Sequence, residues 1–92
     1  MSPVFHPGHH ELHGVTVVLE TTGPLTYLGR FDTQDEHGMH LLDVAVHDGG
    51  GATSKEEFIQ RSARFGIRAE RKHVVVRAEE VARIRRLGEV EA

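Results

Sequence analysis

Alternating hydrophobic and polar positions, separated by short turn sequences, dominate the first half of the chain. Three such segments are rich in β-branched, aromatic or other apolar residues and predict β-strands: GVTVVLE at Gly14–Glu20, LTYLGRFD at Leu25–Asp32 and MHLLDVAVHD at Met39–Asp48. The sequences between them, TTGP and TQDEHG, are typical of turns. We therefore expect strands one to three to form an antiparallel meander joined by short turns.

The second predicted strand carries its large apolar residues on one face. Leu25, Tyr27 and Phe31 follow a period of two, and Gly29 lies between the last two. A glycine inside a strand permits the sharp bend that a small barrel needs. The pattern therefore predicts a strand that bends near Gly29.

The middle of the chain leaves two interpretations open. The sequence DGGGATS is flexible by composition. After it, Ser54 and Glu57 fit a capping box, and Gly66 fits a helix end. These signals predict a short helix over Lys55–Phe65. The alternative is a long strand that starts near Phe58, with the preceding glycines in a hairpin loop.

The C-terminal third returns to extended structure. The sequence GIRAERKHVVVRA is β-prone, and we expect Val74–Val76 to be a fully buried strand centre. The following AEEVARIRRL fits a turn that leads into a short strand. It also fits an amphipathic helix, in which Glu79 and Arg83 form an i,i+4 pair.

Length and composition indicate one small globular domain. The chain has 92 residues, of which 38% are hydrophobic, and no cysteine, which excludes disulfides, a thiolate nucleophile and a cysteine zinc site. No apolar run is long enough for a transmembrane helix, and MSPVFHPGHH lacks the pattern of a signal peptide. We therefore expect a cytoplasmic protein.

Charge is distributed unevenly along the chain. The formal net charge is −3, which argues mildly against strong non-specific binding to nucleic acid. Residues 1–46 carry one base and six acids, whereas residues 47–92 carry ten bases and eight acids. In a self-associating protein this asymmetry would place opposite charges across an interface. Otherwise the charged residues simply form solvated faces.

Two motifs, in this order along the chain, resemble those of the Sm/LSm family, as in a divergent member. The first has a turn glycine, then Gly-x-apolar-x-x-x-Asp, a Met-Asn pair and an apolar strand; it matches at Gly23, Gly29, Phe31, Asp35, Met39, His40, Leu41 and Leu42. The second has apolar-Arg-Gly followed by two spaced apolar positions; it matches at Val76, Arg77, Ala78, Val81 and Ile84. The resemblance covers roughly residues 14–87, apart from the central segment 48–70.

The chain departs from the family pattern at several positions. Gly23 and Gly29 are one residue further apart than is usual, and Gly38 is an additional residue in the first motif. His40 stands in place of the Asn, and Ala78 stands in place of the Gly. The central connection is longer than in a minimal Sm protein. The fold tolerates such changes, and the feature they weaken is the nucleotide pocket that the resemblance implies.

The resemblance implies an all-β fold: a small, strongly bent, five-stranded antiparallel SH3-like barrel of the Sm type. A short N-terminal arm or helix and a longer central connection would complete it. The single domain, residues 1–92, then divides into an arm (1–13), strands one to three (14–47), a variable connection (48–66), strands four and five (67–87) and a tail (88–92). The resemblance also favours a turn after Arg77, with Val81 and Ile84 returning to the core.

The resemblance further implies a homo-oligomeric ring that binds single-stranded RNA, with strand four of one subunit paired to strand five of the next. The residues implied at the RNA site are Asp35, His37, Met39, His40, Arg77 and Ala78. His37 would stack on a base, His40 would read its edge and Arg77 would pack beside it. Imidazole and guanidinium planes both stack on bases, so this chemistry is reasonable.

The alternative is a structural or protein-interaction scaffold that has the same barrel and binds no RNA. In that case Asp35 caps a turn. Arg77 then pairs with Glu79 or Glu80, or with a neighbouring subunit. An unidentified protein partner would replace RNA as the ligand.

Other chemistries have weaker signals. Four histidines, which are potential zinc, nickel or copper ligands, cluster near the N-terminus at His6, His9, His10 and His13. Pro7 and Gly8 among them indicate a mobile arm, and we expect no specific metal site there. The sequence DGGGATSKEE lacks the Gly-Lys-Ser/Thr ending of a phosphate loop, and no motif places a catalytic pair of acids. We therefore expect no enzymatic activity and no cofactor.

Overall fold

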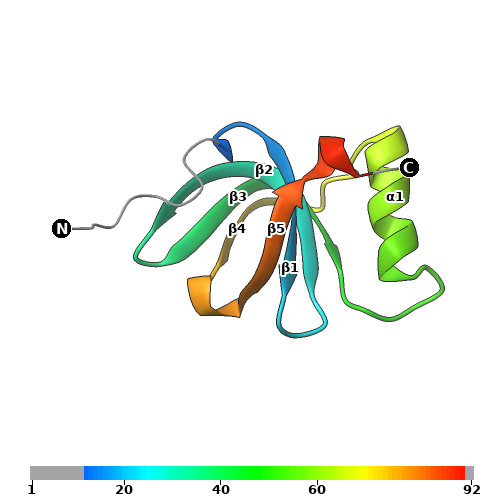
Figure 1. The fold of residues 1–92 in the computed structure, drawn as a ribbon, viewed down its shortest axis with the longest axis horizontal. Coiled ribbons are helices and arrows are strands. Elements are labelled where there is room, and N and C mark those ends of the chain that lie inside the picture. Colours follow the sequence, from blue (N-terminus) through cyan, green and yellow to red (C-terminus); the bar gives the residue numbers. More distant parts are fainter. Residues whose placement is uncertain (1–11, 91–92) are drawn as a thin grey trace.

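The computed structural model describes residues 12–90, and its main feature is a five-stranded antiparallel sheet with one α-helix (Figure 1). The elements in chain order are β1 (Thr16–Thr21), β2 (Thr26–Asp35), β3 (Gly38–His47), α1 (Lys55–Phe65), β4 (Arg71–Val76), the 3-10 turn η2 (Ala78–Glu80), β5 (Val81–Arg86) and the 3-10 turn η3 (Leu87–Glu89). Within residues 12–90, none of the helices has the length and apolar character needed to cross a membrane.

The strands lie in the order β4-β3-β2-β1-β5 across the sheet. β1, β2 and β3 form the predicted meander, in which Leu19 pairs with Tyr27 and Phe31 pairs with Leu41. β5 returns to pair with β1, so β4 and β5 lie at the two edges. Because β4 and β5 are not paired with each other, the sheet is open and does not close on itself.

The helix lies in the central connection, between β3 and β4, and not at the N-terminus. The expected N-terminal arm or helix falls mostly on residues 1–11, which lie outside the described residues. The Ser54 hydroxyl accepts a hydrogen bond from the Glu57 N–H at 3.1 Å, and the Glu57 carboxylate accepts one from the Ser54 N–H at 3.2 Å. This capping box begins α1, and Gly66, with φ of 96°, ends it. The helical interpretation of this segment is confirmed, and the strand interpretation is wrong.

β1 is buried on both faces, which determines where α1 packs. One apolar cluster consists of Leu12, Val17, Leu19, Phe31, Met39, Leu41, Val44 and Val76. The other consists of Val18, Leu28, Ile59 and Leu87. Because successive residues of a strand point to opposite faces, Ile59 holds α1 on the face of β1 that Val18 occupies. Ile59 is only 1% exposed, and full burial of such a side chain contributes about 1.5–3 kcal/mol.

Gly29 lies opposite a β-bulge in β3. The ladder between β2 and β3 shifts here, so Gly29 faces both Asp43 and Val44. A Cβ atom at position 29 would lie 2.9 Å from Val44 Cγ2, a distance that ordinary Cβ atoms do not reach. Asp43 adopts a positive φ of 53° at this bulge, and its carboxylate lies 3.1 Å from the guanidinium of Arg30. Glycine is therefore required at position 29 by close packing between the strands.

The valines of β4 are not all buried, which corrects the expectation of a fully buried strand centre. Val76 is buried, Val74 is half-buried, and Val75 is 39% exposed. β4 is an edge strand with one face on the core, so alternate side chains point outward. After it, η2 makes a turn, and Val81 and Ile84 of β5 pack against the core. The turn interpretation of this segment is confirmed, and the long helix is wrong.

Candidate functional site

The two turns that the motifs single out lie side by side at one end of the sheet. Met39 at the start of β3 pairs with Val76 at the end of β4. Between β2 and β3, Gly38 adopts a φ of 133°, and a Cβ atom there would overlap the carbonyl of Val76 and come within 2.9 Å of Arg77 Cα. Glycine at this additional position therefore allows the β2–β3 turn to approach the β4–β5 turn.

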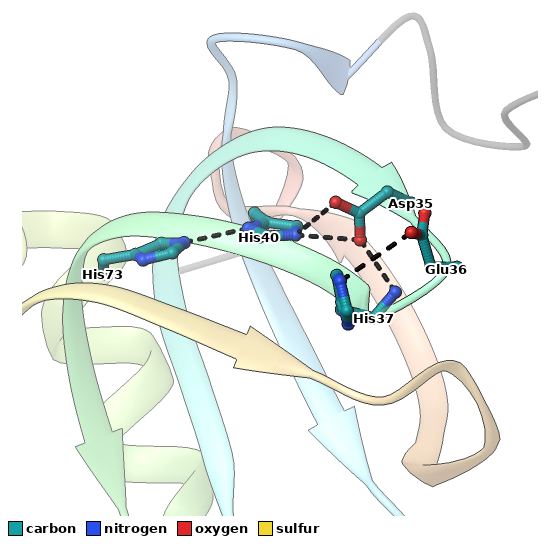
Figure 2. A network of polar contacts seen from close by, with 5 residues as sticks. All are labelled: Asp35, Glu36, His37, His40 and His73. Atoms are coloured by element: carbon teal, nitrogen blue, oxygen red, sulfur yellow. Dashed lines mark hydrogen bonds and ion pairs between the residues drawn. The ribbon is translucent and has the colours of Figure 1, made fainter.

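Asp35 is the centre of a polar network at the end of β2 (Figure 2). Its Oδ1 accepts a hydrogen bond from the His37 backbone N–H at 2.9 Å, which closes the turn. Both of its carboxylate oxygens lie 3.0 Å from Nε2 of His40. The hydrogen bond from His40 is the main cause that lowers the pKa of Asp35; desolvation opposes it, and the His37 N–H adds to it.

His73 extends this network across the neighbouring strand. Its Nε2 lies 2.9 Å from Nδ1 of His40, and the two rings are stacked with centroids 5.1 Å apart. β4 supplies His73 and β3 supplies His40, so the contact joins two strands on the outer face of the sheet (Figure 2). We call the hydrogen-bonded series Asp35–His40–His73 the histidine network.

The hydrogen-bond pattern of the histidine network selects the tautomer of a neutral His40 ring. An ionised carboxylate only accepts hydrogen bonds, so Nε2 of His40 carries a proton. In the neutral ring Nδ1 is then an acceptor, and Nε2 of His73 must donate to it. Both ring nitrogens of His40 are therefore engaged, and its side chain is only 16% exposed. This geometry holds His40 in one orientation.

The remaining residues of the predicted RNA site have different surroundings. The side chain of His37 is exposed, and its ring lies 3.8 Å from the Glu36 carboxylate. The guanidinium of Arg77 is exposed and forms an ion pair with Glu79 at 2.7 Å. Met39 is buried in the core, and Ala78 is exposed at the start of η2. His37 and Arg77 are therefore the accessible planar groups among the predicted residues.

Acidic side chains surround this end of the sheet. They are Asp35, Glu36, Glu79 and Glu80, which lie on the two turns. Glu79 is already paired with Arg77, a cation that a phosphate would need, and Glu36 lies beside His37. The local field is thus less favourable to a polyanion than the family resemblance implies.

Within residues 12–90, no group of three or more His, Asp or Glu side chains is arranged to hold a metal ion. Of the N-terminal histidines, His6, His9 and His10 lie outside the described residues. His13 is described, and its Nδ1 lies 2.5 Å from the carbonyl oxygen of Asp32.

His73 is the residue of this site that the sequence motifs do not indicate. The usable signal is the strand register: once Met39 is paired with Val76, His40 lies opposite Val75 and His73 lies two residues away on the same face. No protein-family model matches the chain, and no curated protein matches it. The fold and the geometry of the two turns are therefore the basis for a functional proposal.

Proposed function

We propose that the chain is a cytoplasmic Sm-like protein that assembles into a homo-oligomeric ring and binds single-stranded RNA at the β2–β3 and β4–β5 turns. The strand order β4-β3-β2-β1-β5 supports this most directly, because it leaves β4 and β5 as free edges of six residues each. In the proposed fold, β2 and β3 bend strongly to form a barrel of the Sm type. β4 of one subunit then pairs with β5 of the next.

The free edges give a physical reason for assembly. An unpaired edge strand exposes a row of backbone N–H and C=O groups, and proteins pair, cover or charge such edges. Within residues 12–90, no further strand pairs with the outer side of β4 or β5. Val75 on β4 is also exposed. Pairing between subunits would satisfy the backbone groups of both edges and cover this side chain.

The charge on the two edges determines the conditions for assembly. Both edges are basic, with Arg71 and Lys72 on β4 and Arg83, Arg85 and Arg86 on β5. Arg85 is paired with Glu20 at 3.4 Å, whereas Arg71, Lys72 and Arg83 form no ion pair with another described residue. Like charges on neighbouring strands repel. We therefore expect assembly to strengthen with salt or with a bound polyanion.

RNA contact at the turns would use His37 and Arg77, with His40 as a positioning residue. The ion pair between Arg77 and Glu79 is exposed, and such pairs contribute only about 0–1 kcal/mol. Stacking of one base on a planar side chain is worth about 1–3 kcal/mol. Breaking this ion pair therefore costs less free energy than stacking of one base provides. A ring would repeat the contact in every subunit.

The second candidate function is a protein-interaction scaffold that forms the ring and binds no RNA. The histidine network favours it, because His40 uses both ring nitrogens within the protein and has none left to read a base. The acids on the two turns favour it as well, since they repel phosphate.

Two measurements test these proposals separately. Light scattering across a range of protein and salt concentrations should give a ring, and a strict monomer throughout would contradict the assembly. Titration of U-rich and A-rich oligonucleotides at low salt should show binding that weakens in Arg77→Ala and His37→Ala. A ring that forms normally but binds neither oligonucleotide would support the scaffold.

A further inference from the structure

A groove of about 780 Å³ lies between α1 and the segment that leads into β4. Its apolar floor includes Ala45, Phe58 and Ile67, and its rim includes Arg61, Phe65 and Arg68. The helix lies at the opposite end of the molecule from the β2–β3 turn (Figure 1). This region, which we call the α1 groove, is therefore separate from the site described above.

Phe65 is the least expected residue of the α1 groove. Phe65 is 77% exposed, although it ends a helix whose Ile59 is fully buried. Phe58, Arg61 and Phe65 fall at spacings of three and four residues, so they form one stripe along α1. The guanidinium of Arg64 lies 5.9 Å from the centroid of the Phe65 ring. An exposed ring with cations beside it is a surface that can stack on a flat ligand.

Positive charge is concentrated along the same segment. Residues 61–72 contain five basic residues and one acid, in a chain whose formal net charge is −3. Arg61, Arg64 and Arg68 are all exposed and form no ion pair with another described residue. The acid, Glu70, accepts a hydrogen bond from the Val46 N–H at 3.4 Å. The α1 groove thus offers unpaired cations to a ligand that carries several negative charges.

We infer that the α1 groove is a binding site for single-stranded nucleic acid, in which a base stacks on Phe65 while Arg61 and Arg68 contact the flanking phosphates. Stacking platforms lined by cations bind single strands because every base has a π face and every linkage has a phosphate. An acidic peptide would neutralise the arginines but would not require an exposed aromatic ring. The inference shares its class of ligand with the proposed RNA binding, and it does not require the ring or the turns.

Fluorescence anisotropy with a labelled oligo-uridine of about 12 nucleotides tests the α1 groove. Phe65→Ala should weaken binding by about tenfold, in line with the loss of one stacked base. The double variant Arg61→Ala with Arg68→Ala should lower the slope of log Kd against log salt concentration. The expected decrease is the contribution of about two phosphate contacts. Arg30→Ala is the control, because it removes an exposed arginine from the inner strand β2 and leaves both the groove and the two edge strands intact. Circular dichroism melting of each variant confirms that it is folded.

Three outcomes would overturn the inference. One is unchanged binding in Phe65→Ala. Another is an equal loss in Arg30→Ala and Arg61→Ala, which would mean that only net charge matters. The third is competition by poly-glutamate as effective as that by an oligonucleotide of equal charge, which would indicate an acidic protein partner. Arg77→Ala separates the two proposals: binding that depends on Phe65 but not on Arg77 would contradict RNA contact at the turns and support the α1 groove.

Discussion

Polar side chains at one end of the molecule are paired with one another, whereas those at the other end are not. At the β2–β3 turn, Asp35, His40 and His73 satisfy one another within 3.0 Å. In the α1 groove, Arg61 and Arg68 have no ion-pair partner among the described residues, and Phe65 is exposed beside them. Asp35 and His40, which the motifs indicate, are thus already hydrogen-bonded within the chain.

This difference separates a structural role from a binding role. A polar group whose hydrogen bonds are complete loses them when a ligand enters, so a ligand gains little there. An exposed cation or ring loses only its contacts with water when a ligand binds, so the net free-energy change favours binding. We therefore expect substitutions in the histidine network to affect stability and pH response. Substitutions of exposed groups, His37 and Arg77 at the turns and Phe65 in the α1 groove, should affect binding.

The largest effect on stability is expected beneath the α1 groove. Ile59→Ala should lower the free energy of unfolding by about 2–5 kcal/mol, because it leaves a cavity between α1 and the sheet. Phe65→Ala on the same helix should change it by less than about 0.5 kcal/mol, since that ring is exposed. Urea denaturation measures both. Equal losses would mean that Phe65 supports the fold and is not a free surface.

The next largest effect is expected where the two turns meet. Gly38→Ala should lower the free energy of unfolding by about 1–3 kcal/mol or more, because it forces a side chain into a positive-φ position against the backbone of Val76. Gly23→Ala is the matched control, since a Cβ there meets nothing within 4 Å. A Gly38→Ala protein as stable as Gly23→Ala, in urea titrations run side by side, would show that the turns do not approach so closely.

A smaller effect, seen only in acid, is expected from Asp35. Because the folded state lowers the pKa of Asp35, its ionised form stabilises the fold above the unfolded pKa of about 3.8. That contribution is lost as the pH falls through the lower folded value. Wild-type protein should therefore lose more stability than Asp35→Asn between pH 5 and strongly acidic pH. Thermal melts across this range measure it, with Asp48→Asn as control; parallel curves for wild type and Asp35→Asn would contradict the network.

The smallest effect is expected at the outer end of the histidine network. His73→Ala removes one exposed hydrogen bond, so it should lower the free energy of unfolding by about 0.5–1.5 kcal/mol or less. The bond from His40 Nε2 to Asp35 should remain, and the 15N shifts of the His40 ring should still report a proton on Nε2. Lys72→Ala, on the neighbouring residue of β4, is the control. A change of His40 tautomer in His73→Ala would mean that His73, not Asp35, holds the ring.

Part of the candidate site could be predicted from sequence, and part could not. Asp35 capping its turn and Arg77 pairing with Glu79 were both open to prediction, because each contact joins residues only two positions apart. His73 escaped prediction because its partner is 33 residues away. The exposure of Val75 could not be predicted for a related reason: a run of three valines does not indicate that its strand lies at an edge of the sheet.

The sequence alone determined strands β1 to β3. For α1 and for the turn after Arg77 it supplied the local signals but left a strand and a helix, respectively, as alternatives. Their signals lie within a few residues, where propensity, capping and turn geometry act directly. The tertiary structure alone decided which polar groups are left without partners. The register of β3 against β4 engages both nitrogens of His40, and the packing of Ile59 beneath α1 leaves Phe65 and the arginines exposed. Such outcomes depend on contacts between distant segments, which no local pattern encodes.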